Sequence, residues 1–455
     1  MENKEFLGTA PIGKLLWKLS IPTLVAQLIN MLYNVVDRIY IGHIPEVGSL
    51  ALTGVGVCLP IILIVSAFAA LVSSGGAPRA SIFMGKQEME NAEKTLGGCF
   101  TLQILVSLVL TLVLLIFGKS LLLAFGASDN TISYAVDYLW IYSLGTPFVQ
   151  LTLGMNAFIT AQGFTKISML SVAIGAACNI VLDPIFIFLL DMGVSGAALA
   201  TVISQGISCV WVLRFLSGKK TFLRLRKEHM KIDPKVVLPC VALGTATFIM
   251  QASESVISVC FNSSLLKYGG DVAVGSMTVL TGIMQLALMP VQGLGQGAQP
   301  IISFNYGARN AQRVRDAFRC LLISSLAYTL IFCTLVQLFP RPFVMLFNNN
   351  PELVDFAVWA LRIYSFGISI FGIQMACQQT FMSLGNAKTS LFLAVWRKII
   401  LLIPLIYILP HFFDDKVFAV FLAEPIADIL AVITTAILFA MQFRKSMALL
   451  ESPDK

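Results

Sequence analysis

The sequence predicts an all-α integral membrane protein with twelve transmembrane helices, in two six-helix lobes related by pseudo-two-fold symmetry along the membrane normal. Composition, the count of long apolar segments and an internal repeat predict it. Hydrophobic residues make up 57% of the 455 residues and charged residues 12%, against roughly 25% charged in typical soluble domains. So few charges could not cover the surface of a soluble protein of this size.

The apolar segments are long enough to cross a bilayer, since a spanning helix needs about 20 mainly apolar residues. None alternates with the period of two that a membrane β-barrel requires. We expect twelve spans, at residues 15–42, 50–84, 95–117, 131–162, 167–190, 194–216, 236–267, 272–304, 318–339, 353–384, 389–411 and 417–443.

The two halves of the chain repeat at a constant separation of 222 residues. Matching pairs include Gly75 with Gly297, Pro78 with Pro300, Ser81 with Ser303, Gly145 with Gly367 and Gly163 with Gly385. Six helices per half is an even number, so both halves enter the membrane in the same orientation, with a transport pathway between them. We expect an N-terminal lobe at 1–216, a basic cytoplasmic linker at 217–235 and a C-terminal lobe at 236–455.

Lysine and arginine residues predict the orientation. The formal net charge is +7, and the basic residues lie in the gaps between apolar segments. Most of the 31 fall on one side, with a dense run in 217–235, whereas the other side holds only Lys119, Lys267, Arg341 and Lys416. Positive loops stay inside, so we expect both termini in the cytoplasm, a multi-pass protein of the cell (inner) membrane, and no nucleic-acid partner.

Polar residues at helical spacing indicate a hydrated cavity, because polar side chains facing lipid are costly. Spacings of three and four residues place them on one face of each helix. Hydrogen bonds that hold neighbouring helices together are the alternative interpretation. The cavity hypothesis assigns substrate contacts to Gln27, Asn30, Asn34, Gln251, Glu254, Ser258, Gln285, Gln292, Gln374 and Gln378.

Asp37, Asn179 and Asp183 are the candidates for ion coupling. Asn179 and Asp183 are four residues apart and share a helix face, and Asp37 lies at a similar depth. Burial and a second carboxylate both disfavour the ionised form, so the pair could bind a proton, or accept Na⁺ with the amide oxygen as an extra ligand. The alternative for Asp183 is that it satisfies backbone groups freed by Pro184.

Further charged residues lie within the second half. Glu254 is near the middle of the membrane and is a candidate for binding substrate or a proton. Arg397 and Lys398 come to a similar depth as Glu424 and Asp428. We expect a structural ion pair between Arg397 and Asp428, because unpaired charges at this depth are costly.

Catalytic and cofactor motifs are missing. Gly118, Lys119 and Ser120 resemble the end of a P-loop, but Val113 stands where glycine is required. The nine cysteines are scattered and form no CxxC motif. We expect no catalytic residue, no metal site and no cofactor beyond a coupling ion, H⁺ or Na⁺.

Four segments resemble the multidrug and toxic compound extrusion (MATE) family, and the similarity covers essentially the whole chain. They are Asn34-Val-Val-Asp-Arg-Ile-Tyr-Ile-Gly42, Ala161-Gln-Gly-Phe-Thr-Lys166, Asn179-Ile-Val-Leu-Asp-Pro184 and Pro300-Ile-Ile-Ser-Phe-Asn-Tyr-Gly-Ala308. The resemblance implies two lobes that open alternately to either side of the membrane. It also implies export of drugs, typically amphipathic organic cations, in exchange for H⁺ or Na⁺.

The resemblance also assigns roles to residues. In the family, a first-lobe aspartate and an Asn/Asp pair carry ion coupling, at positions matched here by Asp37, Asn179 and Asp183. Members with a second-lobe cation site carry an acid on the seventh helix, which Glu254 matches. They carry another on the tenth helix, where this sequence has only Gln374, Gln378 and Gln379. This departure favours coupling through the first lobe.

Together these observations predict a secondary active efflux antiporter that works by alternating access. Its expected partners are the lipid bilayer and small amphipathic, often cationic molecules, and it is expected to act as a monomer. The alternative is a flippase for a lipid-linked saccharide. The anionic pyrophosphate of such a lipid would call for a cavity rich in arginine and lysine, whereas the polar faces here carry Gln, Asn, Asp and Glu.

Overall fold

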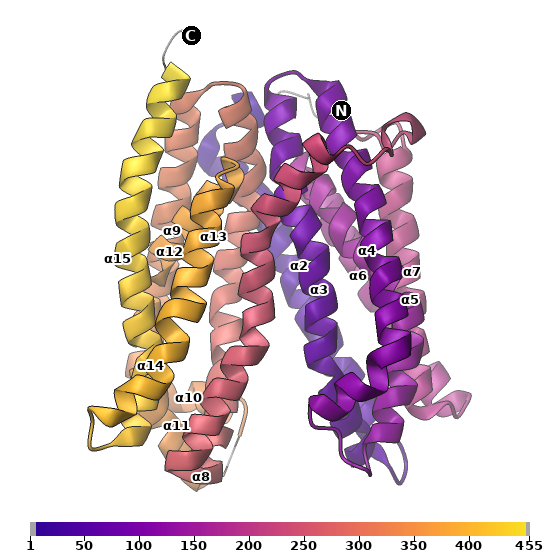
Figure 1. The fold of residues 1–455 in the computed structure, drawn as a ribbon, viewed down its shortest axis with the longest axis vertical. Helices are drawn as coiled ribbons and strands as arrows, with labels where there is room; N and C mark the ends of the chain where they lie inside the picture. Colours follow the sequence, from indigo (N-terminus) through magenta and orange to yellow (C-terminus); the bar gives the residue numbers. More distant parts are fainter. Residues whose placement is uncertain (1–5, 349, 452–455) are drawn as a thin grey trace. The chain divides into compact units, whose positions relative to one another are not determined.

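The computed structural model describes residues 6–348 and 350–451, and every regular element among them is a helix (Figure 1). In chain order the elements are α1 (Phe6–Thr9), α2 (Ile12–Gly42), α3 (Gly48–Gly85), α4 (Met89–Ala124), α5 (Ile132–Ala161), α6 (Thr165–Pro184), η1 (Ile185–Leu189), α7 (Gly193–Ser217), η2 (Lys227–His229), α8 (Pro234–Gly307), α9 (Ala311–Leu338), α10 (Pro340–Met345), α11 (Pro351–Tyr364), η3 (Ser365–Gly367), α12 (Ile368–Ser383), α13 (Ala387–Val395), η4 (Trp396–Leu402), α14 (Ile403–Ile408), η5 (Leu409–His411) and α15 (Lys416–Glu451).

Ten helices of the described chain are long and apolar enough to cross a membrane. One of them, α8, contains two of the predicted spans, joined at Gly270, whose φ of +65° only glycine adopts without strain. The 30-residue helix α5 is not among the ten, and it buries polar side chains such as Thr146 and Gln150. Counting both spans of α8 and adding α5 gives the twelve predicted helices.

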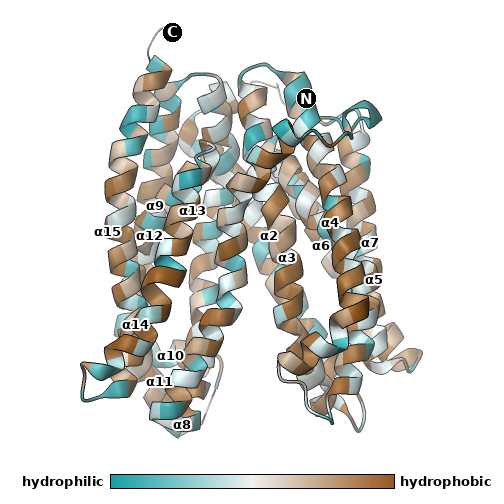
Figure 2. Ribbon diagram, in the orientation of Figure 1, coloured by the Kyte–Doolittle hydropathy of each residue, from teal (hydrophilic) through white to brown (hydrophobic). Residues whose placement is uncertain are grey.

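Several helices are longer than the apolar segments that predicted them. Helix α4 begins six residues before the predicted start at residue 95, and its first turns carry an exposed ion pair in which Lys94 Nζ lies 2.7 Å from Glu90. Figure 2 shows the same trend, with hydrophilic residues concentrated towards helix ends. Hydropathy detects only the part of a helix that lies in lipid, so it misses the turns that continue into water.

The described chain divides into two compact units, one formed by residues 25–244 and the other by 6–24 together with 245–451. The predicted lobes differ from these units in two places. The start of α2 belongs to the second unit, and residues 236–244 at the start of α8 belong to the first. Close packing at glycines explains both differences.

In the first unit, the start of α8 packs tightly against α3. A Cβ atom at Gly75 would collide with the carbonyl group of Cys240, and one at Gly244 would collide with the carbonyl group of Leu71. Only glycine allows two helix backbones to approach this closely. These contacts hold residues 236–244 on the first unit.

In the second unit, the start of α2 makes the equivalent contact with the second span of α8. Gly297 has no room for a Cβ atom beside Ser20, and the Thr23 hydroxyl donates to the carbonyl oxygen of Gly293 at 2.8 Å. Gly297 is the repeat equivalent of Gly75. Each repeat therefore gives the first part of its first helix to the other unit.

The repeat is visible in individual hydrogen bonds. The Ser81 hydroxyl donates to the carbonyl oxygen of Ala161 at 2.7 Å, and the Ser303 hydroxyl donates to that of Ser383 at 2.8 Å. Both the donors and the acceptors are 222 residues apart. The sequence repeat thus corresponds to the same helix contact, made once in each unit.

Residues 217–235, predicted as a linker, are fixed to the first unit. The side-chain oxygen Oε1 of Gln162 accepts hydrogen bonds from the Thr221 hydroxyl and from the backbone amides of Phe222 and Leu223, at 2.8 to 2.9 Å. One buried glutamine therefore orders the chain immediately after α7.

Candidate functional site

Asp37 on α2 and Asp183 on α6 lie side by side in the first unit. Their carboxyl groups are within hydrogen-bonding reach of each other. Asp183 is fully buried and Asp37 is half-buried. Oδ1 of Asp37 and Oδ2 of Asp183 are buried without a hydrogen-bond partner among the described residues. The two candidates that sequence reasoning placed at a similar depth therefore share one site.

Asn179 completes this cluster. Its amide nitrogen donates to Oδ1 of Asp183 at 3.2 Å and lies 3.5 Å from the Thr201 hydroxyl of α7. The amide oxygen of Asn179 is also buried without a partner in the described chain. Three unsatisfied oxygens, from Asp37, Asn179 and Asp183, can hold a proton, or a hard cation that prefers oxygen ligands.

No basic side chain forms an ion pair with this acid cluster within residues 6–348 and 350–451. Arg38, whose own side chain is exposed, is the cationic group that interacts with Asp37. The Asp183 carboxylate interacts with Asn179 and Asp37, and no backbone hydrogen bond to it is present around Pro184 in that part of the chain. When ionised, the carboxyl groups of the cluster therefore have no ion-pair partner in that part of the chain, and a bound proton or cation could neutralise them.

An open pocket with about 450 Å³ of empty space lies beside the cluster and includes Asn179 in its wall. Polar and small side chains dominate this wall, which suits a hydrated cavity. Its lining residues are Asn30 and Tyr33 of α2, Thr152, Leu153 and Asn156 of α5, Val172, Gly175, Ala176 and Asn179 of α6, and Thr201, Ser204, Gln205 and Ser208 of α7.

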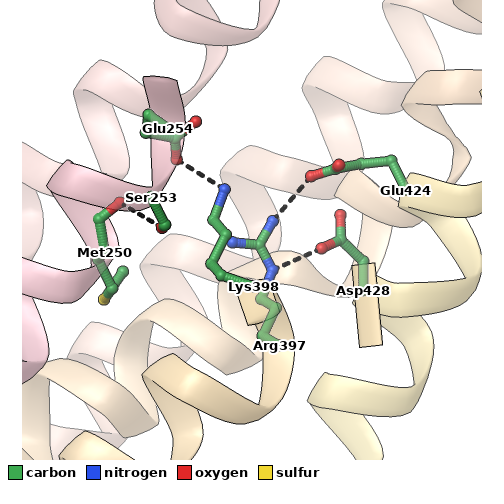
Figure 3. A network of polar contacts seen from close by, with 7 residues as sticks. All are labelled: Met250, Ser253, Glu254, Arg397, Lys398, Glu424 and Asp428. Carbon is green, nitrogen blue, oxygen red and sulfur yellow. Dashed lines mark hydrogen bonds and ion pairs between the residues drawn. The ribbon is translucent and has the colours of Figure 1, made fainter. Parts of the chain in front are cut away.

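The second unit holds a separate network of charged residues, shown in Figure 3. Arg397 in η4 donates from Nε to Asp428 at 2.7 Å and from its terminal nitrogen to Glu424 at 3.1 Å. Its guanidinium also lies over the ring of Phe371, 4.5 Å from the centroid. The predicted contact between Arg397 and Asp428 is present, and Glu424 shares the same guanidinium.

Lys398, the next residue in η4, contacts Glu254. Its ammonium lies 2.6 Å from Oε1 of that carboxylate. The Lys398 side chain is 7% exposed, whereas the Glu254 side chain is 55% exposed. Glu254 therefore has one oxygen on an internal cation while much of its surface stays accessible.

A smaller open pocket, with about 280 Å³ of empty space, adjoins Arg397 and Lys398. Its other lining residues are Met250, Phe371, Gln374, Met375, Gln378, Leu393 and Ala394. Gln374 accepts a hydrogen bond from Thr435 at 2.5 Å, and Gln378 donates to the carbonyl oxygen of Ser390 at 3.1 Å. The two glutamines thus line a pocket and bridge helices as well.

Both ionisable clusters lie next to π-helical turns. Asp183 and Pro184 immediately precede η1, and Arg397 and Lys398 lie within η4. In the repeat, η1 and η4 belong to the fifth long helix of each half. Proline at position 184 removes one backbone hydrogen bond, and π-helical turns are frequent at functional sites.

Comparison with known proteins identifies the family. The sequence model of the MatE family matches residues 22–185 and 246–408, and so covers both units. The chain belongs to the MatE family. It is 25% identical over 432 residues to the multidrug export protein MepA of Staphylococcus haemolyticus, covering 94% of each chain. It is 22% identical to MepA of Staphylococcus aureus, covering 96% of each.

Solved structures of MATE transporters share the fold. An outward-facing multidrug resistance MATE family transporter superimposes with a TM-score of 0.91 at 22% identity, over 100% of this chain and 99% of the other. A MATE structure in the bent conformation gives 0.92 at 22% identity, over 99% and 100%. The MatE fold, with twelve helices in two lobes in a multi-pass membrane transporter, is as the sequence predicted.

The remaining cavity candidates of this MatE chain differ in exposure. Gln27 and Asn30 are half-buried, and Asn30 is the member of that group that lines the first-unit pocket. The exposed candidates are Asn34, Gln251, Glu254, Ser258, Gln285 and Gln292. Their side chains are accessible on the described chain, and their assignment to a substrate cavity stays a prediction.

Sequence reasoning missed the contribution of α7 to this MatE site. Thr201, Ser204, Gln205 and Ser208 line the first-unit pocket, and Thr201 contacts Asn179. Their spacing of three, one and three residues places them on one helix face, so the signal was present. It was weak because serine and threonine are common in transmembrane helices.

Proposed function

We propose that this MatE transporter is a secondary active antiporter that exports amphipathic organic cations in exchange for H⁺ or Na⁺. The names of the two MepA relatives, which match along nearly their whole length, support small-molecule export. We further propose that it acts as a monomer in the cell (inner) membrane with both termini in the cytoplasm, as the distribution of basic residues predicts.

The acid cluster of Asp37, Asn179 and Asp183 carries this proposal. Three buried oxygens in one cluster lack a partner among the described residues, and buried polar atoms rarely remain so. A proton shared by the two carboxyl groups would satisfy two of them. A sodium ion would satisfy all three, with the Thr201 hydroxyl close enough to assist. We assign ion coupling to this cluster.

Coupling follows from competition between two occupants of the transporter. The ion favours one conformation by neutralising the cluster, and the substrate favours another, so each drives the release of the other. One elementary charge that moves through 100 mV releases about 2.3 kcal/mol, which corresponds to about a fiftyfold concentration ratio.

Transport in reconstituted vesicles tests the proposal. Purified protein would be given ethidium, with a pH gradient or a Na⁺ gradient imposed separately. We expect uptake or release to follow one gradient and to fall at least about tenfold in Asp37→Asn and Asp183→Asn, because each removes a charge that the ion neutralises. Asp191→Asn is the matched control, since Asp191 is exposed. Transport at wild-type rates by both cluster variants would refute the assignment.

The flippase alternative is not favoured. The first-unit pocket contains no arginine or lysine among its lining residues, and the two MepA relatives are named as multidrug exporters. A lipid pyrophosphate would find no cationic partner in that pocket.

A further inference from the structure

The charged network of the second unit contains one more carboxylate than it has cationic groups. Among the described residues, Glu254, Glu424 and Asp428 form ion pairs with two basic side chains, Arg397 and Lys398. Glu424 and Asp428 are buried, as are both basic residues. Uncompensated charge is costly in a membrane interior, and one monovalent cation would neutralise it.

The two basic side chains are held differently. Arg397 binds Glu424 and Asp428 at the same time and stacks on Phe371, so its position is fixed by three contacts. Lys398 has a single ion pair, to Glu254, and also interacts electrostatically with Glu424. Lys398 therefore has two carboxylates within its influence, one accessible and one buried (Figure 3).

We propose that Glu254 is a docking carboxylate for cationic substrates, and that Lys398 is a built-in competitor whose position depends on whether Glu424 holds a proton. This inference rests on the proposed export of organic cations. It adds a second site for exchange between proton and substrate, independent of the acid cluster in the first unit.

The charges of the network determine the exchange. With Glu424 ionised, Lys398 is attracted towards it, and the Glu254 carboxylate is free to pair with a cationic substrate. When Glu424 takes a proton from water, two carboxylates remain for two cations, so Arg397 keeps Asp428 and Lys398 returns to Glu254. The substrate then loses its partner, and one proton replaces one monovalent organic cation.

The surroundings of Glu424 contain the groups that this switch needs. Arg397 and Lys398 face it from η4, Glu254 from α8, Asp428 from its own helix α15, and the buried Tyr364 from α11. The four-carbon stem of a lysine is flexible, so its ammonium can move between two carboxylates without a backbone change. Its location in the π-helical turn η4 is a second observation that points to function.

Binding of ethidium to the purified full-length protein tests the inference. Fluorescence anisotropy would be measured at mildly acidic and mildly alkaline pH, in a background carrying Asp37→Asn and Asp183→Asn to remove titration of the first unit. Lys398→Met is expected to bind ethidium about tenfold more tightly at acidic pH, since the competing charge-assisted bond is gone. Lys388→Met is the matched control, because Lys388 is exposed on α13, outside the network.

Two further variants separate docking from switching. Glu254→Gln is expected to weaken ethidium binding about tenfold and to cancel the effect of Lys398→Met. Glu424→Gln imitates the protonated acid, so it is expected to keep the low affinity of acidic pH at both pH values. Binding by Lys398→Met that is unchanged or weaker overturns the proposal, as does pH dependence that survives in Glu424→Gln.

The outcomes remain decisive if one variant does not fold. Should Lys398→Met fail to elute as a monodisperse protein, Glu424→Gln alone decides, because it leaves two carboxylates for two cations. Failure of the wild-type protein to transport ethidium under any ion gradient refutes the proposed function. Wild-type transport with no effect of the Glu424 and Lys398 variants on binding refutes this inference only.

Discussion

The two units have equivalent helices but differ in whether their acidic side chains form ion pairs with basic ones. In the first, Asp37 and Asp183 lie together, and neither forms an ion pair with a basic side chain in the described residues. In the second, Arg397 and Lys398 stand among three carboxylates. Both sites lie at the fifth long helix of their repeat, next to a π-helical turn. The two turns are not at equivalent positions of the repeat, because 222 residues after η1 lie residues 407–411 and not η4. The acids of the first unit form no ion pair with a basic side chain among the described residues, whereas those of the second unit pair with Arg397 and Lys398.

Removing the internal cation should produce the largest difference between the units. Arg397→Met leaves Glu424 and Asp428 buried without their guanidinium, and breaking a buried pair costs about 3–5 kcal/mol. Thermal unfolding of the purified protein in detergent, together with the yield of monodisperse protein, measures the loss. A midpoint within error of the wild type would show that the network does not stabilise the second unit.

The first unit should instead gain stability from its ion. At an ion concentration about 100-fold above its dissociation constant, the wild type should gain about 2.7 kcal/mol. Asp183→Asn should lose this gain without loss of basal stability, because it removes a carboxylate that has no basic partner. Unfolding midpoints would be measured over a series of Na⁺ concentrations and of pH values. An equal ion response in Asp183→Asn would place the ion elsewhere.

A helix contact that occurs once in each unit should contribute equally to the stability of both units. Ser81→Ala and Ser303→Ala each remove the same buried helix-to-helix hydrogen bond, at a cost of about 1 kcal/mol each. Unfolding midpoints of the two variants would be compared directly, with the double variant as a test of additivity. Clearly unequal losses would mean that the two contacts are not energetically equivalent.

The smallest effect is expected at the exposed ion pair between Arg341 and Asp355, whose side chains are 59% and 68% exposed. Arg341→Met should change the free energy of unfolding by about 0–1 kcal/mol, since exposed pairs contribute little. The same replacement at Arg397 is its buried counterpart. A similar loss at both positions would show that burial does not determine the strength of these pairs.

Most of the helices, and the proximity of the two acids in the first unit, could be predicted from the sequence. Apolar length and the repeat predicted the helices, because a lipid solvent imposes both on the chain. The sequence could predict that Asp37 and Asp183 lie close together, because the spacing of residues along a helix and their depth in the membrane can both be counted along the chain. The role of these residues stays a prediction.

Other features depend on distances that sequence spacing does not contain. The sequence predicted that Lys398 lies at a similar membrane depth to Arg397. Its contact with Glu254, however, depends on how the π-helical turn rotates η4 relative to α8. The transfer of residues 6–24 to the second unit depends on close packing at Gly297. Glycines lie at many contacts between membrane helices, so a glycine in the sequence does not identify the segment that packs against it.

The exchange of helix ends between the units makes each repeat incomplete by itself. A single repeat on its own would lack the segment that covers the glycine face of its second helix, and would expose that face to lipid or water. A second copy supplies the segment, as in a domain-swapped dimer. Neither repeat therefore has a complete set of helix contacts without the other.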